Sequence, residues 1–508
     1  MKIAAVGLCA LVIAGHTPQP ALDAPAPCAA MANVSMPRAS ITLATVVEPG
    51  AFAPPVPGTD AQAYRSLPAF CRVAATLRPT GDSDIRIEVW MPAAGWNGKL
   101  QAVGNGAFNG AIAYRAMAAA LARGYAAAST DTGHVGAGAS FALGHPEKVV
   151  DFGWRAVHEM TVTSKRIIAA HYQRNPQFSY WNGCSAGGRQ AIKEAQRFPE
   201  DFDGIIAGAP GLDWTGRAAQ AVRMAKRLEA NEPARLSQAQ IQRVHRSVVD
   251  ACDALDGVAD GLIEDPTRCT FDPAVLRCEG GADATCLTAP QIETVRLMYS
   301  NPVNPRSKRA IAGLAPGSEL GWTSLGWTAS ARATGLDQFR FLVFNDPAWT
   351  IQQFNFDVDV VLAEATDNGT INALDPNLEP FIARGGKLIH YHGWSDPQIS
   401  PGSSTQYYSR VKDAVGSVST LHDSYRLFMA PGMAHCGGGE GPNAFDMVSA
   451  LEAWVEHGKA PDRIVASHST NGVVNRTRPL CPYPQRAVYK GVGSSDEAVN
   501  FDCRTRQD

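Results

Sequence analysis

Short apolar runs alternate along much of the chain with stretches in which apolar residues recur at helical spacing. Residues 85–90 alternate between apolar and polar side chains, which predicts a strand. Further strands are predicted at residues 99–103, 124–131, 177–181, 202–210, 387–392 and 425–429. Helices are predicted at residues 157–171, 188–195, 403–415 and 444–457. Strands and helices that alternate at these intervals indicate a parallel α/β sheet.

This alternation stops between residues 212 and 365. The interrupted stretch contains four cysteines and many aromatic side chains, most of which we expect to be buried rather than to contact a ligand. We therefore predict an α/β core in two parts, residues 27–211 and 366–508, with an inserted lid domain at residues 212–365.

The N-terminal residues 1–26 are predicted to be a secretory signal. Lys2 precedes an apolar run that ends near Gly15, and prolines and small residues follow. The run is too short to span a bilayer, and no later segment of the sequence is apolar enough. We expect a secreted or periplasmic protein that has no membrane partner once the signal is removed.

Composition limits the possible partners. The 508 residues are 45% hydrophobic and 18% charged, as in ordinary globular proteins. The formal net charge is -3, so the chain lacks the basic excess of a nucleic-acid-binding protein. We expect no nucleic acid partner.

The segment Gly183-Cys184-Ser185-Ala186-Gly187 fits the G-x-S-x-G nucleophile elbow. A predicted strand precedes it and a predicted helix follows it, which is the setting that an exposed nucleophilic serine requires. The five residues alone are equally compatible with a glycine-rich turn around a passive serine.

A serine nucleophile needs a base, and the base needs an orienting carboxylate. In α/β-hydrolases these residues follow the serine in the order acid, then histidine. Asp396 lies just after the predicted strand at 387–392, and His435 lies in a glycine-rich loop after the strand at 425–429. An aspartate before proline is also a common turn former. His390 and His392 are rival histidines, but their place within a strand suits a core or pocket role better.

The cysteines predict disulfides. Of the eleven, Cys9 lies in the presumed signal, and an even number in an exported chain favours disulfides over zinc, since no C-x-x-C pair exists. Proximity along the chain pairs Cys28–Cys71, Cys252–Cys269, Cys278–Cys286 and Cys481–Cys503.

Elimination leaves Cys184 and Cys436, which are the neighbours of Ser185 and His435. The order of the catalytic residues and the parity of the cysteines therefore point to the same bond. The loop-entropy model assigns roughly 5 kcal/mol to a bond that closes about 250 residues. Its larger effect would be to fix the distance between serine and histidine.

Cys184-Ser185, Asp396 and His435-Cys436 resemble the CS-D-HC arrangement of the tannase/feruloyl esterase family, which includes the hydrolase of mono(2-hydroxyethyl) terephthalate. The resemblance covers the mature chain. It implies an α/β-hydrolase core with a large inserted lid, secretion, and hydrolysis of small or plant-polymer-derived esters of aromatic acids. Feruloyl esterase is the first expectation, and tannase or chlorogenate esterase is the second.

The oxyanion hole is predicted to use the backbone N–H of Ala186, the residue after the nucleophile. A second N–H should come from the loop at 104–110, where the resemblance favours Gly106. Ile399, three residues after Asp396, is predicted to face the substrate pocket. The matching position is aromatic in the terephthalate monoester hydrolase, so Ile399 argues against that activity.

The resemblance also implies a structural calcium site in the lid, held by the carboxylates of Asp253, Asp256 and Asp260 and the carbonyls of Val258 and Leu262. Carboxylates at this spacing can wrap a hard cation, although the pattern alone suits a solvated turn equally well. A secreted serine peptidase and a non-catalytic binding protein remain as functions of other classes. The intact set of serine, aspartate and histidine argues against a binding protein.

Overall fold

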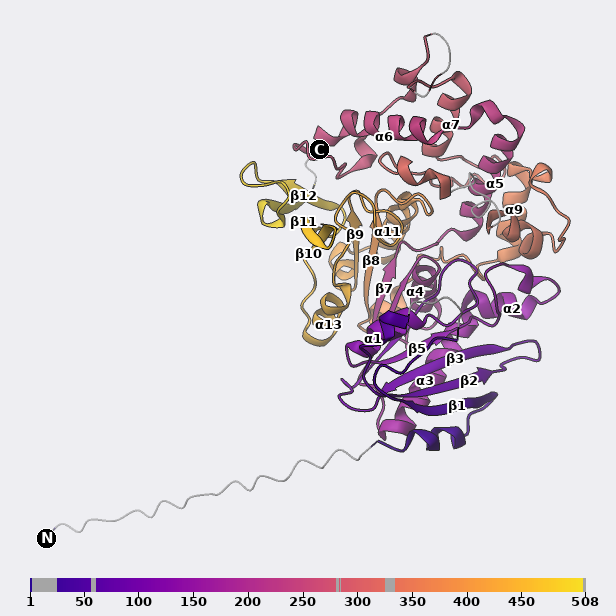
Figure 1. Ribbon diagram of the computed structural model, residues 1–508, viewed down its shortest axis with the longest axis vertical. Coiled ribbons are helices and arrows are strands. Elements are labelled where there is room, and N and C mark those ends of the chain that lie inside the picture. Colours follow the sequence, from indigo (N-terminus) through magenta and orange to yellow (C-terminus); the bar gives the residue numbers. More distant parts are fainter. Residues whose placement is uncertain (2–24, 56–60, 280–282, 284, 325–333, 506–508) are drawn as a thin grey trace.

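The computed structural model of the protein describes residue 1 and residues 25–55, 61–279, 283, 285–324 and 334–505 (Figure 1). Most of the predicted secretory signal lies outside these ranges. Within them, no helix combines the length and the apolar character needed to cross a membrane.

A nine-stranded sheet forms the centre of the fold. Its strands are Ala39–Val47 (β1), Phe70–Leu77 (β2), Ile85–Pro92 (β3), Lys99–Val103 (β4), Ala126–Thr130 (β5), Phe178–Cys184 (β6), Gly204–Gly208 (β7), Lys387–Gly393 (β8) and Tyr425–Ala430 (β9). Their spatial order is β1-β2-β3-β5-β4-β6-β7-β8-β9. From β5 to β9 all neighbours are parallel, whereas β1, β2, β3 and β5 pair antiparallel. The predicted parallel α/β sheet is confirmed.

Helices cover both faces of this sheet. One face carries α1 (Tyr114–Ala122) and α13 (Met447–His457), and the other carries α3 (Ala156–Tyr172), α4 (Ala186–Arg197) and α11 (Pro401–Val415). The short helices α2 (Pro146–Val150) and α12 (Val418–His422) lie in connections. Tyr180 and Trp181 are neighbours on β6 but belong to different buried clusters, because successive side chains of a strand point to opposite faces.

An insertion that is mostly helical separates β7 from β8. Within the described residues its α-helices are α5 (Trp214–Ala230), α6 (Gln238–Cys252), α7 (Ala289–Tyr299), α9 (Phe356–Asp367) and α10 (Glu379–Ala383). Figure 1 shows α5, α6, α7 and α9 gathered at one end of the molecule, above the sheet. The insertion has two apolar clusters of its own, and its aromatic residues Trp322, Phe339 and Trp349 are buried there, as expected. The limits 212–365 for a separate lid domain stay a prediction.

The chain ends in two small antiparallel sheets that the sequence analysis does not predict. Strand β10 (Ile464–Thr470) pairs with β11 (Val473–Leu480), and β12 (Gln485–Tyr489) pairs with β13 (Phe501–Thr505). Most side chains of β11 are exposed or half-buried, so the apolar periodicity that reveals a strand is weak there.

A buried histidine links the insertion to the core. His245 on α6 lies 2.8 Å from Glu319 through Nδ1 and 2.8 Å from Glu440 through Nε2. Burial alone would lower the pKa of His245, but its bonds with the two carboxylates outweigh burial and raise the pKa to about 9. Glu440 belongs to the loop after β9, which also carries His435. The protonated histidine therefore joins the insertion to the loop of the predicted base.

This link should make stability depend on pH. Because the folded-state pKa of about 9 lies above the ordinary 6.5, the contribution is complete below about pH 6.5 and is lost as pH rises through 9. We expect the Tm of the wild type to fall over that interval, and the Tm of His245→Gln to fall less. Thermal unfolding at several pH values measures this. His457→Gln, at an exposed position on α13, is the control, and equal pH dependence in all three proteins would contradict the link.

Candidate active site

Ser185 occupies a strained turn between β6 and α4. Its φ of 64° and ψ of -119° are rare for a residue with a side chain. Its N–H donates to the carbonyl of Gly208 at 2.9 Å. A Cβ on Gly183 would lie 2.6 Å from the carbonyl carbon of Gly187, so this close approach requires glycine. The predicted strand, turn and helix around Ser185 are confirmed.

Three predicted residues from distant parts of the chain meet at this turn. His435 Nε2 lies 2.9 Å from Ser185 Oγ, and His435 Nδ1 lies 2.6 Å from Asp396 Oδ2. Ser185, Asp396 and His435 follow β6, β8 and β9, whose carboxyl ends share one edge of the sheet. In this geometry the imidazole can take the hydroxyl proton and so make the serine nucleophilic.

Asp396 is fully buried, yet four donors surround its carboxylate. Oδ1 accepts from the backbone N–H groups of Gln398 at 2.8 Å and Ile399 at 3.0 Å. Oδ2 accepts from His435 and, at 3.1 Å, from His392 Nε2. Burial alone would raise the pKa of Asp396, but the bonds from His392 and His435 outweigh it and hold the pKa well below its usual range. The group is therefore a carboxylate at neutral pH.

A buried chain of hydrogen bonds holds His392 in place. His392 Nδ1 lies 2.7 Å from Ser404 Oγ, which lies 2.7 Å from His390 Nε2, and His390 Nδ1 lies 2.8 Å from the hydroxyl of Tyr425. Burial, with His392 nearby, lowers the pKa of His390 well below its usual value, so His390 is neutral. Each hydrogen bond in this chain has one donor and one acceptor when every group donates its proton to the next group on the way to Asp396.

From the sequence, His390 and His392 are expected in a core or pocket role, and their support of Asp396 is not predicted. Both side chains are indeed fully buried. The available signal was the spacing, because His392 precedes Asp396 by four residues across the turn that ends β8.

The five predicted disulfides are confirmed. They join Cys28 to Cys71, Cys184 to Cys436, Cys252 to Cys269, Cys278 to Cys286, and Cys481 to Cys503. The Cys184–Cys436 bond spans 252 residues and joins the neighbours of Ser185 and His435, with 6.0 Å between the Cα atoms. Cys436 has a φ of 62°, and Ser185, the neighbour of Cys184, has a φ of 64°, so the bond joins two segments with unusual backbone geometry.

The residues predicted for the oxyanion hole lie on two adjoining segments. Ala186 is the first residue of α4, so its N–H has no partner within the helix. Gly106 is exposed on the loop after β4. Asn105 ties this loop to α4, because its carbonyl accepts from Gly187 N–H at 2.8 Å and its side chain from Gln190 Nε2 at 2.9 Å. The role of Gly106 and Ala186 stays a prediction.

Ile399 is buried close to the turn at Ser185. A Cβ on Gly211 would meet Trp214 at 3.3 Å and Ile399 at 3.5 Å, and Gly211 N–H donates to the carbonyl of Ser185 at 3.2 Å. The contact of Ile399 with substrate stays a prediction.

Aromatic side chains from the core and from the insertion pack beside the same turn. Trp214 packs edge-on against Phe108 at 5.1 Å, and both share an apolar cluster with Phe152 and Ala186. A cavity of about 420 Å³ adjoins this cluster, and Phe341 and Ile371 belong to both. These residues are far apart in sequence, so no local pattern reveals that they meet.

The loop predicted to hold calcium is tightly wound. Gly257 and Gly261 have φ values of 98° and 83°, which place them in the left-handed region. The Asp253 carboxylate accepts from the N–H groups of Asp260 at 3.2 Å and Gly261 at 2.8 Å.

One oxygen in this loop fits a cation. Asp256 Oδ2 is buried and accepts no hydrogen bond from any described residue. Burial first, and then the charges of neighbouring carboxylates, raise the pKa of Asp256 to about 6. Arg478 donates to Asp260 from β11. Calcium ligation by Asp253, Asp256, Asp260, Val258 and Leu262 stays a prediction.

The sequence matches known proteins over nearly its whole length. The family described as "Tannase and feruloyl esterase" matches residues 71–504. An uncharacterised esterase of Xanthomonas campestris is 40% identical, with 95% of this chain and 92% of that protein covered. A probable feruloyl esterase B-1 of Aspergillus oryzae is 33% identical, with 93% of this chain and 92% of that protein covered.

The fold matches a solved structure equally well. The crystal structure of feruloyl esterase B from Aspergillus oryzae has a TM-score of 0.88 and 32% sequence identity, and the match covers 94% of this chain and 99% of that one. The predicted α/β-hydrolase core with a large insertion is therefore confirmed.

The Cys184–Cys436 bond should control the reactivity of Ser185. In the Cys184→Ser/Cys436→Ser variant, His435 is held by noncovalent contacts alone, and we expect labelling by a fluorophosphonate to slow by about 10- to 100-fold, the cost of a small misplacement. The Cys278→Ser/Cys286→Ser variant, which opens a bond in the insertion with a separation of 8 residues, should label at the wild-type rate. Equal rates in the two variants, both folded, would show that the first bond does not position the base.

Proposed function

This chain belongs to the tannase and feruloyl esterase family and is a carboxylic ester hydrolase, and we propose that it hydrolyses esters of hydroxycinnamic-type acids through Ser185, His435 and Asp396. The observation that carries this proposal is the contact of His435 with both Ser185 Oγ and Asp396. The strained turn at Ser185 supports it, because it exposes the hydroxyl beside a helix N-terminus.

In the proposed mechanism Ser185 Oγ attacks the ester carbonyl carbon while its proton passes to His435 Nε2. Asp396 keeps the proton of His435 on Nδ1 and stabilises the imidazolium that forms. The backbone N–H groups of Ala186 and Gly106 would donate to the negative oxygen of the tetrahedral intermediate. The intermediate collapses when the carbon–oxygen bond to the alcohol breaks, and His435 gives its proton to the departing oxygen.

The acyl-enzyme is then hydrolysed by the same groups. Water attacks the acyl carbonyl and gives a proton to His435, and this proton returns to Ser185 Oγ when the acid leaves. The buried hydrogen bonds behind Asp396 support these steps, because they hold its carboxylate ionised while His435 gains and loses charge.

We propose that the apolar cluster beside the serine receives the flat aromatic acid. Trp214, Phe108 and Ile399 offer aromatic and branched surfaces close to the turn, which suits a phenolic ring on a short linker. Several relatives are named feruloyl esterase B, and these names support hydroxycinnamic esters as the proposed substrates of this chain. Galloyl or chlorogenate esters are the second candidate, since they also carry a phenolic acid.

A panel of esters tests the substrate class. We expect kcat/KM to be higher for methyl ferulate and methyl caffeate than for methyl gallate and the terephthalate monoester. A preference for gallate would favour a tannase instead. Faster cleavage of a peptide p-nitroanilide than of a p-nitrophenyl ester would identify a peptidase.

The Ser185→Ala variant tests the mechanism. Without the nucleophile we expect kcat to fall by about 10⁶-fold, as in other serine hydrolases. Ser419→Ala removes an exposed hydroxyl on α12 and should leave kcat unchanged. Retention of substantial turnover by a folded Ser185→Ala protein would exclude Ser185 as the nucleophile.

We further propose that the chain is exported and holds a structural Ca²⁺ ion through Asp253, Asp256, Asp260 and the carbonyls of Val258 and Leu262. The five disulfides support export, because such bonds persist in oxidising compartments. The unpartnered oxygen of Asp256 supports the ion. Ca²⁺ supplies charge neutralisation there and takes no part in the chemistry at Ser185.

Removal of calcium should destabilise the fold. At a Ca²⁺ concentration 100 times its Kd the ion adds about 2.7 kcal/mol to the free energy of unfolding. We expect EGTA to lower the Tm of the wild type and of Asp250→Asn, which changes an exposed carboxylate on α6, but not that of Asp256→Asn. A wild-type Tm that is the same with EGTA and with Ca²⁺ would contradict the site.

A further inference from the structure

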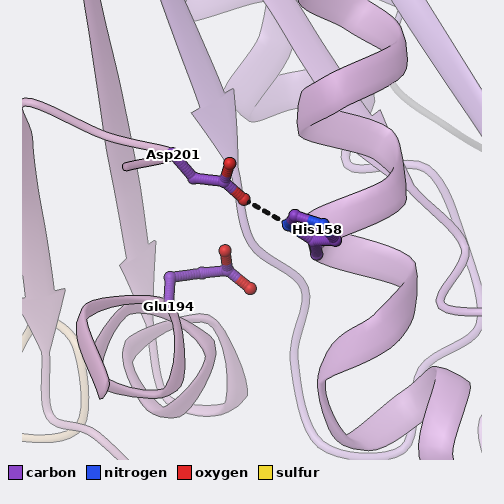
Figure 2. A group of neighbouring side chains, drawn as sticks. All are labelled: His158, Glu194 and Asp201. Carbon is purple, nitrogen blue, oxygen red and sulfur yellow. Dashed lines mark hydrogen bonds and ion pairs between the residues drawn. The ribbon is translucent and has the colours of Figure 1, made fainter. Parts of the chain in front are cut away.

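A second cluster of metal-binding side chains lies away from the nucleophile. His158 on α3, Glu194 on α4 and Asp201 on the connection to β7 each offer one ligand atom, and these atoms lie within 4.8 Å of one another. Figure 2 shows the three side chains converging from these separate elements. Glu194 is near the end of α4, whereas Ser185 precedes its start, so the cluster takes no direct part in the proposed chemistry.

Glu194 is the observation that distinguishes this cluster from an ordinary ion pair. Its side chain is 1% exposed, and neither carboxylate oxygen has a hydrogen-bond partner among the described residues. Figure 2 shows this carboxylate directed at His158 and Asp201. A buried carboxylate that accepts no hydrogen bond is unfavourable unless a proton or a cation neutralises it.

Two basic side chains lie in or beside the cluster, but neither of them donates a hydrogen bond to Glu194. His158 Nδ1 lies 2.7 Å from Asp201 Oδ2, and the ring of His158 stacks on Phe198 at 3.8 Å. Lys165 is close, but its Nζ donates to the backbone carbonyl of Asp201 at 2.5 Å. The His158 side chain is 25% exposed, so solvent reaches the edge of the cluster.

We propose that His158, Glu194 and Asp201 bind a divalent transition-metal ion of the Zn²⁺ type as a structural site. One imidazole nitrogen and two carboxylates form a mixed donor set that suits such ions, and water reaching the exposed edge can complete a tetrahedron. Bonds of about 2.1 Å place tetrahedral ligands about 3.4 Å apart, between the 2.7 Å contact and the 4.8 Å limit. The ion ties α3 to the end of α4, the helix that follows Ser185.

Zinc titration of the full protein tests the proposal. The oxidised protein is freed of metals with a chelator, Ca²⁺ is restored to saturation, and ZnCl₂ is titrated by calorimetry. We expect one Zn²⁺ per chain and a higher Tm with zinc. Co²⁺ in place of zinc should show the visible absorption of a site of low coordination number with a nitrogen ligand. Failure of the wild type to bind Zn²⁺ would overturn the proposal and leave a proton shared by Glu194 and Asp201 as the neutralising charge.

Two variants locate the bound ion. Glu194→Gln keeps the shape of the side chain, and His158→Asn keeps a polar group, so at least one of them should fold. Loss of either ligand should weaken Zn²⁺ binding at least about 100-fold, since even outer-shell changes cost 10- to 100-fold. Glu200→Gln, an exposed carboxylate next to Asp201, should bind as the wild type does. Unchanged zinc affinity in Glu194→Gln or His158→Asn would place the ion elsewhere and overturn the proposal.

Discussion

The buried carboxylate of Asp396 is the constraint on which the site depends. A charge with no access to water is stable only where donors surround it, and the four donors to Asp396 come from its own turn, from β8 and from the loop after β9. These segments must therefore reach their final positions together. One of these donors is His435 itself, so the same bonds stabilise the buried carboxylate and hold His435 in its position.

The strands of the core, the disulfides and the three residues at the turn are predictable from the sequence because each follows from a short pattern or from chain order. The short strands β4, β7 and β8 are buried at nearly every position, and each has a run of apolar residues that predicts a strand. The disulfides are predictable from the even number of cysteines after the signal and from their closeness along the chain. Asp396 and His435 were identified from chain order and from their place after strands, a rule that holds whatever the insertion contains.

The remainder depends on contacts between residues that no short pattern connects. His392 reads as a strand residue until Ser404 and His390 are seen to hold it. Glu194 reads as an ordinary polar residue of a helix until the fold is seen to bury it. The same limit applies to β10–β13, where short antiparallel strands with exposed side chains show little periodicity.

The Cys184–Cys436 bond has a topological consequence. It converts the 252-residue separation between the two cysteines into a covalent ring that includes the whole insertion. A single proteolytic cut in an exposed loop of that ring opens it without separating the two products. Ser185 and His435 then remain in one covalently linked molecule. Surface loops of the insertion that are open to cleavage are therefore compatible with keeping the two residues together.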